Sequence, residues 1–256
     1  MIIDRAVRLL AMLAGLLALA SADARPLPMA AACQQAGGAQ AGGRTADRQA
    51  RFVLRSAEVA CRLKAAHYDV ILFGDSIMRQ WPAPSLRQTF PGRRVLNAGI
   101  GGDETSDLLA WLDGKRAGSP GSAASPDWST QEPRLIILMI GSNDVRRGAS
   151  ASQVAAGVIA AARRVHGLYP QAALMLLDIL PRGAGQGDFV QVIKRANQAV
   201  RLWAEQQGPA ITFADAHSAM HCEAADCGLY RPPDYIHLTP AGYDRLSQLV
   251  RTQMTR

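Results

Sequence analysis

Five short apolar runs alternate along the chain with longer segments in which apolar residues recur every three or four positions. The runs are DVILFG at 69–74, RRVLNAG at 93–99, RLIILMIG at 134–141, AALMLLDIL at 172–180 and AITFADA at 210–216. Such continuous apolar runs are typical of parallel strands that are buried on both faces. We therefore predict an α/β fold with a five-stranded parallel sheet that helices cover on both sides.

Helical spacing is clearest in four segments, which are 45–66, 152–170, 190–208 and 239–254. The third ends at Gly208, as helices commonly do, and the fourth begins with Thr239 as a predicted N-cap before a proline. Residues 113–133 are rich in glycine, serine and proline instead. This segment is too polar for the core, and we expect a surface loop near the site.

The first 24 residues have the pattern of a secretory signal peptide. Arg5 and Arg8 flank the start, an apolar run of 12 residues follows at 9–20, and small residues precede Ala22 and Ala24. Because the run is short for a bilayer span, a membrane anchor or a buried helix is the weaker alternative. The predicted organisation is a signal peptide at 1–24, a flexible segment at 25–44 and one domain at 45–256, with a periplasmic or secreted location and no stable membrane insertion after cleavage.

The four cysteines are expected to form disulfides in an exported protein. Cys222 and Cys227 are separated by four residues, which favours a local bridge, and Cys33 would then pair with Cys61. Four cysteines allow three connectivities in principle. A zinc site is the rival, but C-x4-C without a second close pair fits zinc spacing poorly.

The formal net charge of +7 favours anionic partners. The chain has no cluster of lysine and arginine with interleaved aromatic residues, so we do not expect nucleic-acid binding. A basic, solvated surface is the preferred explanation of the charge. Arg79, Arg146 and Arg182 lie beside the motifs described next; solvated surface is the preferred explanation for each, and the binding of an anionic group is the alternative.

Four polar motifs follow the predicted strands or lie near the C-terminus. They are GDS at 74–76, NAGIGGDET at 97–105, GSND at 141–144 and DYIH at 234–237. In parallel sheets, ligands bind beyond the carboxyl ends of the strands, and three of the motifs stand there. These motifs are therefore expected to meet at one site.

Together the motifs supply the groups that serine hydrolysis needs. Ser76 offers a nucleophile, His237 a general base, and Asp234 a carboxylate close enough in sequence to orient the imidazole. The N–H groups of Ser76 and Gly102 and the side-chain amide of Asn143 are candidate donors for an oxyanion hole. Each residue alone also suits a structural explanation, namely a helix cap, a tight turn, a lone core histidine or half of a metal site.

The set GDS, NAGIGGD, GSND and DYIH resembles the four blocks of the GDSL-type SGNH hydrolases, which are esterases and lipases with a flavodoxin-like three-layer α/β/α fold. The resemblance runs from about residue 70 to the C-terminus. It implies a triad of Ser76, Asp234 and His237, an oxyanion hole that includes Gly102 and Asn143, and no metal or organic cofactor. Asp75 is then expected to stabilise the nucleophile turn. The sequence segments NAGIGGDET, ILPRG and HLTPAGY are most similar to the branch of the platelet-activating-factor acetylhydrolase catalytic subunits. That branch has bacterial relatives that act on sugar esters.

The residues beside the motifs are small and polar, and aromatic residues are only 5% of the chain. A lipase needs a sizeable apolar surface for its acyl chain. We therefore expect a secreted esterase for acetyl or similarly short acyl groups on a small molecule or a carbohydrate. The alternatives are a lipid esterase, a non-catalytic carbohydrate-binding relative and, because of the glycine-rich GIGG segment, a dinucleotide-binding protein.

Overall fold

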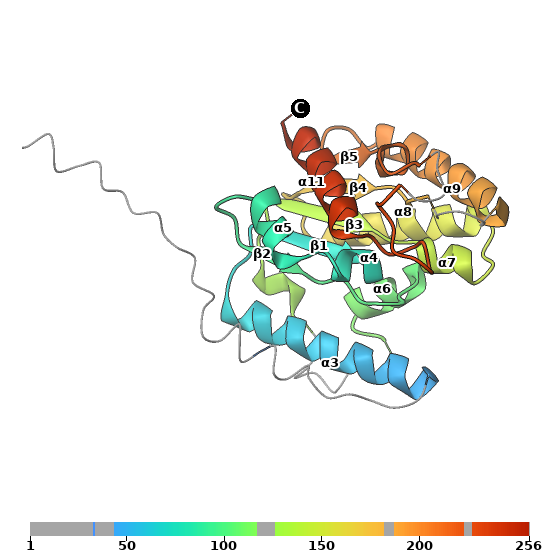
Figure 1. The fold of residues 1–256 in the computed structure, drawn as a ribbon. Coiled ribbons are helices and arrows are strands. Elements are labelled where there is room, and N and C mark those ends of the chain that lie inside the picture. The colour runs from blue at the N-terminus through green and yellow to red at the C-terminus, as the bar shows by residue number, and fades with distance from the viewer. Residues whose placement is uncertain (1–32, 34–43, 117–125, 182–186, 223–226, 256) are drawn as a thin grey trace, which may run out of the picture.

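The computed structural model describes residue 33 and residues 44–116, 126–181, 187–222 and 227–255 (Figure 1). The predicted signal peptide at 1–24 lies outside the described residues. So do Arg182 and the predicted flexible segment at 25–44, except for Cys33 and Arg44. Export and domain organisation therefore stay predictions.

The sheet has five parallel strands in the order β2-β1-β3-β4-β5. The strands are β1 (Val70–Gly74), β2 (Val95–Asn97), β3 (Leu135–Met139), β4 (Ala173–Leu177) and β5 (Ile211–Ala214). In the register of the sheet, Val70 lies opposite Val95 on one side and Leu135 on the other. All five strands lie within the predicted runs, and their order is the flavodoxin-like one. The predicted fold class is confirmed.

Two helical layers cover the sheet, because side chains of each strand point alternately to its two faces. Ile71 and Phe73 belong to one buried cluster, whereas Val70 and Leu72 belong to the other. The first layer consists of α3 (Arg44–Ala65), α6 (Thr105–Leu112), α7 (Ser142–Arg146), α8 (Ala151–Leu168) and α9 (Gly187–Glu205), with the 3-10 helix η1 (Trp128–Thr130). The second consists of α4 (Ser76–Arg79), α5 (Ala83–Thr89), α10 (Ala216–Ala219) and α11 (Pro240–Met254). The result is an α/β/α sandwich.

The segment 113–133 corrects one prediction, since its described second half is not a polar loop near the motifs. Trp128 is buried, and its ring centroid lies 5.0 Å from that of Trp111. Gln131 is also buried and accepts a hydrogen bond of 3.0 Å from the backbone N–H of Tyr68, just before β1 begins. This half therefore packs at the amino end of β1, opposite to the end that carries GDS. One large apolar side chain outweighs the polar composition around it.

Both expected disulfides are present. Cys33 is bonded to Cys61 in α3, and Cys222 is bonded to Cys227 in the segment that precedes DYIH. Among the described helices, none is both long and apolar enough to cross a membrane.

Candidate active site

Ser76 stands where β1 turns sharply into α4. Gly74 has a φ of +153°, and a Cβ there would lie 2.1 Å from the carbonyl oxygen of Met139, so the turn requires glycine. The Asp75 carboxylate then accepts a hydrogen bond of 2.9 Å from the backbone N–H of Ile77. This N-cap starts α4 at Ser76 and gives Asp75 a structural role in the turn, as the family resemblance implied.

His237 and Asp234 lie in line with the serine. Nε2 of His237 is 2.9 Å from Oγ of Ser76, and Nδ1 is 2.7 Å from Oδ2 of Asp234. Because a carboxylate faces Nδ1, that nitrogen carries the proton and Nε2 is left to accept from the hydroxyl. Partial burial by itself would raise the pKa of Asp234, but hydrogen bonds from the His237 ring and from the N–H groups of Ile236 and His237 outweigh it and lower that pKa to about 2. The carboxylate is therefore ionised at neutral pH.

Contacts between α4 and α11 hold the serine and the histidine in register. The hydroxyl of Tyr243 in α11 donates a hydrogen bond of 2.7 Å to the carbonyl oxygen of Ile77 in α4. Thr239 caps α11 through the N–H of Gly242 at 3.1 Å, two residues after His237. The position of His237 is thus held by α11, which follows it, and α11 is in turn bonded to α4 through Tyr243.

Gly102 and Asn143 lie beside Ser76 in the same cleft. Gly102 has a φ of +84°, a left-handed conformation that favours glycine. The Asn143 side chain is buried, and its amide donates one hydrogen bond of 2.9 Å to the carbonyl oxygen of Asp103. A side-chain amide has two N–H donors, so this contact orients the group and leaves the second N–H for a ligand.

Two buried acids, Asp103 and Asp144, stabilise the loops that carry Gly102 and Asn143, and no sequence pattern singled them out. Asp144 accepts from the hydroxyl of Thr105 at 2.6 Å and from its backbone N–H at 3.0 Å. The Asp103 carboxylate makes two hydrogen bonds with Arg116, of 2.5 and 2.8 Å. Burial raises the pKa of Asp103 to about 6, against the lowering effect of Arg116. Asp103 lies in the motif NAGIGGDET and Asp144 in GSND, but only the folded structure identifies the partners of the two carboxylates.

The cleft around these groups has a volume of about 660 Å³. Most of the described residues that line it have polar side chains, and Ile100 and Ile236 are its only aliphatic side chains larger than alanine among the described residues. Arg51, Arg79 and Arg146 also line it. Nothing in the sequence pointed to Arg51, which α3 contributes. In the described part of the chain, no group of three or more histidine, cysteine, aspartate or glutamate side chains is placed to hold a metal ion.

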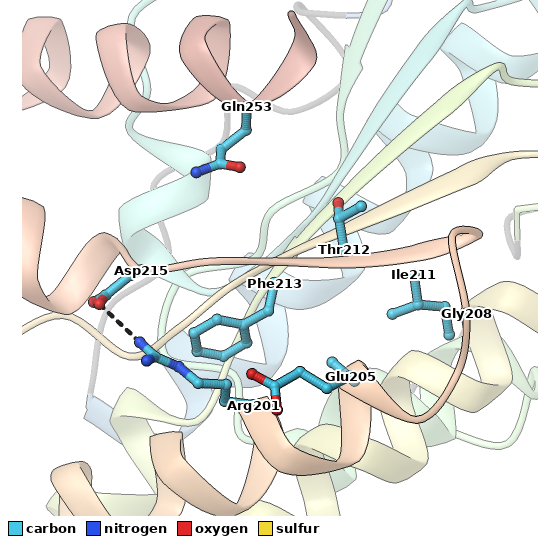
Figure 2. Close-up of a pocket in the computed structure, with 9 residues that line it drawn as sticks. Arg201, Glu205, Gly208, Ile211, Thr212, Phe213, Asp215 and Gln253 are labelled. Carbon is cyan, nitrogen blue, oxygen red and sulfur yellow. Dashed lines mark hydrogen bonds and ion pairs between the residues drawn. The ribbon is translucent and has the colours of Figure 1, made fainter. Parts of the chain in front are cut away.

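A separate hollow lies at the far edge strand, β5, with β3 and β4 between it and β1. Figure 2 shows the Arg201 side chain extended beside the Phe213 ring toward Asp215, with Glu205 below and Gln253 from α11 above. The Arg201 guanidinium pairs with Asp215 at 2.7 Å and lies 5.0 Å from the centroid of Phe213. Its principal charged pair is satisfied, and the hollow contains none of the predicted catalytic groups.

Comparison with known proteins decides the family. The model of the GDSL-like lipase/acylhydrolase family matches residues 72–245, which include all four motifs. The chain belongs to this family. Among curated proteins, this family member is 27% identical over 189 residues to platelet-activating factor acetylhydrolase IB subunit alpha1 of Pongo abelii, covering 73% of this chain and 76% of that protein. It is 25% identical over 179 residues to the alpha2 subunit of Bos taurus, covering 70% and 72%.

Solved structures share the fold of this GDSL-family chain. A GDSL-like lipase from Bacteroides thetaiotaomicron has a TM-score of 0.59 at 18% identity, covering 78% of this chain and 97% of that one. An acetylxylan esterase from Geobacillus stearothermophilus has a TM-score of 0.56 at 18% identity, covering 73% and 94%. At these identities the likeness concerns the fold alone.

Proposed function

We propose that the protein is a secreted serine esterase that removes acetyl or similarly short acyl groups, with a carbohydrate as the alcohol part of the ester. The observation that carries this proposal is the continuous line from Ser76 Oγ through the His237 ring to the Asp234 carboxylate. Membership of a family of lipases and acylhydrolases supports ester hydrolysis as the reaction.

The reaction proceeds in two steps through an acyl-enzyme. Nε2 of His237 accepts the hydroxyl proton of Ser76 while Oγ attacks the ester carbonyl carbon. The imidazolium then donates that proton to the leaving alcohol as the carbon–oxygen bond of the ester breaks. In the second step His237 takes a proton from water, the resulting hydroxide attacks the acyl carbon, and the acid leaves as Ser76 regains its proton.

The oxyanion of each tetrahedral intermediate would accept hydrogen bonds from the backbone N–H groups of Ser76 and Gly102 and from the second N–H of Asn143. Donors that are already oriented in the free enzyme need no reorganisation during the reaction. The contact between Asn143 and Asp103 supports this role, because it fixes the plane of the amide before a substrate arrives.

A short acyl group suits the described lining of the cleft, which offers only Ile100 and Ile236 as larger aliphatic side chains there. Long acyl chains need an extended apolar surface. The names of the curated relatives, which are acetylhydrolases, point the same way. The proposed export accords with the two disulfides, since such bonds persist in oxidising compartments.

Hydrolysis of p-nitrophenyl esters with acyl chains of two to eight carbons tests the proposal. The wild type should hydrolyse the acetate fastest, and Ser76→Ala should lower kcat by at least about 10³-fold. The matched control is Ser106→Ala, an exposed serine in α6, which should keep full activity. Turnover retained in Ser76→Ala would contradict the mechanism, whereas rates that rise steeply with chain length would favour a lipid esterase.

A further inference from the structure

A second cleft, with a volume of about 510 Å³, opens along the edge strand β2. Residues of α3 and α5 line it, and Figure 1 shows these helices on either side of β2. Its charged lining consists of five arginines and one glutamate: Arg55, Arg62, Arg79, Arg87, Arg93 and Glu58.

The positive charge of this cleft is not balanced by the residues that the structure describes. Glu58 already accepts from Arg55 at 2.6 Å and from Arg62 at 3.0 Å. Three exposed arginines, namely Arg79, Arg87 and Arg93, have no side-chain hydrogen bond or ion pair with any residue that the structure describes. Exposed charges of one sign that share a concave surface raise the local concentration of ions of the opposite sign.

The unpaired polar side-chain atoms in the lining of the second cleft are hydrogen-bond donors. Arg62 Nε and Trp81 Nε1 are buried and lack a hydrogen-bond partner among the described residues. The side-chain oxygen of Asn97 already accepts from the N–H of Gly99 at 3.0 Å, and one of its two N–H groups donates to the carbonyl oxygen of Met78 at 2.6 Å. The chemistry of the cleft therefore fits a ligand that offers only acceptors, such as a carboxylate.

Arg79 lines both clefts and so connects them. It ends the short helix that Ser76 begins, and three residues of helix correspond to about 5 Å along the axis. A Cβ added to Gly101 would lie 3.8 Å from Cβ of Ser76 and 4.0 Å from Cδ of Arg79, so both side chains border the same glycine loop. A negative group in the second cleft would therefore lie near an ester carbonyl placed at Ser76.

We propose that the second cleft binds carboxylates of the substrate itself, which is an acylated acidic polysaccharide with its ester in the catalytic cleft. This inference rests on the proposed function. Two adjoining clefts that share a cation suit a chain of repeating charged units. An anionic lipid suits them less, because the exposed large apolar side chains of the described residues, Leu202 and Met254, lie in neither cleft.

Competing polymers test the proposal. Polygalacturonate and xylan, acetylated to the same degree, provide an anionic and a neutral substrate, and p-nitrophenyl acetate reports the chemistry alone. The wild type should have a kcat/KM for the anionic polymer at least tenfold above that for acetylated xylan in low salt. The preference should shrink at 0.5 M NaCl, a salt concentration at which exposed charges are strongly screened; the Debye length is about 10 Å at 0.1 M and about 3 Å at 1 M.

The variant Arg87→Gln/Arg93→Gln removes two exposed charges from the second cleft and none from the catalytic groups. It should lower kcat/KM for the anionic polymer about tenfold, mostly through KM, since each exposed ionic contact contributes modestly. Turnover of p-nitrophenyl acetate should not change. Arg195→Gln/Arg251→Gln, which removes two exposed charges elsewhere, should leave every substrate unaffected.

Three outcomes would overturn the proposal. The first is an equal kcat/KM for the two polymers. The second is a loss of kcat/KM for the anionic polymer that the control variant Arg195→Gln/Arg251→Gln reproduces. The third is binding of phosphatidylglycerol vesicles that depends on Arg87 and Arg93 while the rates with the polymers do not. In each case hydrolysis of p-nitrophenyl acetate that requires Ser76 would leave the proposed esterase function standing. Failure to hydrolyse any ester would instead remove both.

Discussion

The two helical layers carry different halves of the candidate site. Ser76 begins α4 and His237 precedes α11, and both helices bury their apolar side chains on one face of the sheet. Gly102 precedes α6 and Asn143 lies in α7, whose apolar side chains are buried on the other face. The proposed proton relay of Ser76, His237 and Asp234, here called the relay half, thus belongs to one layer. Two of the three proposed oxyanion donors, Gly102 and Asn143, belong to the other layer and are called the oxyanion half.

The two halves are also built differently. The relay half is a single file of hydrogen bonds, and the side chain of Asp234 is 45% exposed. The oxyanion half is buried and cross-connected, since Asn143 is held by Asp103 and Asp144 holds Thr105. The side chains of His237 and Asp234 are thus partly open to solvent, whereas that of Asn143 is enclosed.

Substitution of Asp234 in the relay half should lower kcat the most. In Asp234→Asn, the amide can donate to Nδ1 and so favour the tautomer with its proton on Nε2, which cannot accept from Ser76. We expect kcat for p-nitrophenyl acetate to fall by about 10⁴-fold. Since the pKa of Asp234 is lowered to about 2, the deficit should be the same at every pH from 5 to 8.

The matched control for this change is Asp244→Asn, an exposed aspartate in the same α11 region. It should retain wild-type kcat. Activity of Asp234→Asn within tenfold of the wild type would show that the observed alignment of Asp234 and His237 is not what catalysis depends on.

Substitution of Asn143 in the oxyanion half should lower kcat by a smaller factor. Asn143→Ala removes one of three proposed donors, and we expect kcat to fall by about 10²–10³-fold with little change in KM. Asn197→Ala removes a comparable buried amide, which accepts from the N–H of Ile179, donates to its carbonyl oxygen and does not line the cleft. It should lower the free energy of unfolding and leave the kcat of the folded protein intact. Equal losses of kcat in the two variants would mean that Asn143 acts only through the fold.

The sequence alone was sufficient to predict the sheet and the meeting of Ser76, Gly102 and Asn143 at one edge of it. The reason is that parallel strands are marked by continuous apolar runs, and their carboxyl ends share one edge of the sheet. Ser76, Gly102 and Asn143 each follow such a run within a few residues. Their meeting follows from topology and needs no long-range detail.

Other features depend on contacts that no local pattern encodes. Asp103, which precedes α6, pairs with Arg116, which follows it, and the second cleft is lined by arginines from α3, α4, α5 and the loop before β2. Trp128 lies in a polar segment whose composition predicts a surface loop, and it is buried because Phe73 and Trp111 provide an apolar site for it. These contacts join residues far apart in the chain and arise only when the layers pack.

Covalent labelling tests the central claim, that Ser76 is the nucleophile of an acyl-enzyme, most directly. The protein would be incubated with a fluorophosphonate probe, and the modified peptide would be located by mass spectrometry. We expect one adduct per chain, on Ser76, with its formation abolished in Ser76→Ala and strongly slowed in Asp234→Asn. An adduct on another residue, or ester turnover by a protein that the probe does not modify, would contradict it.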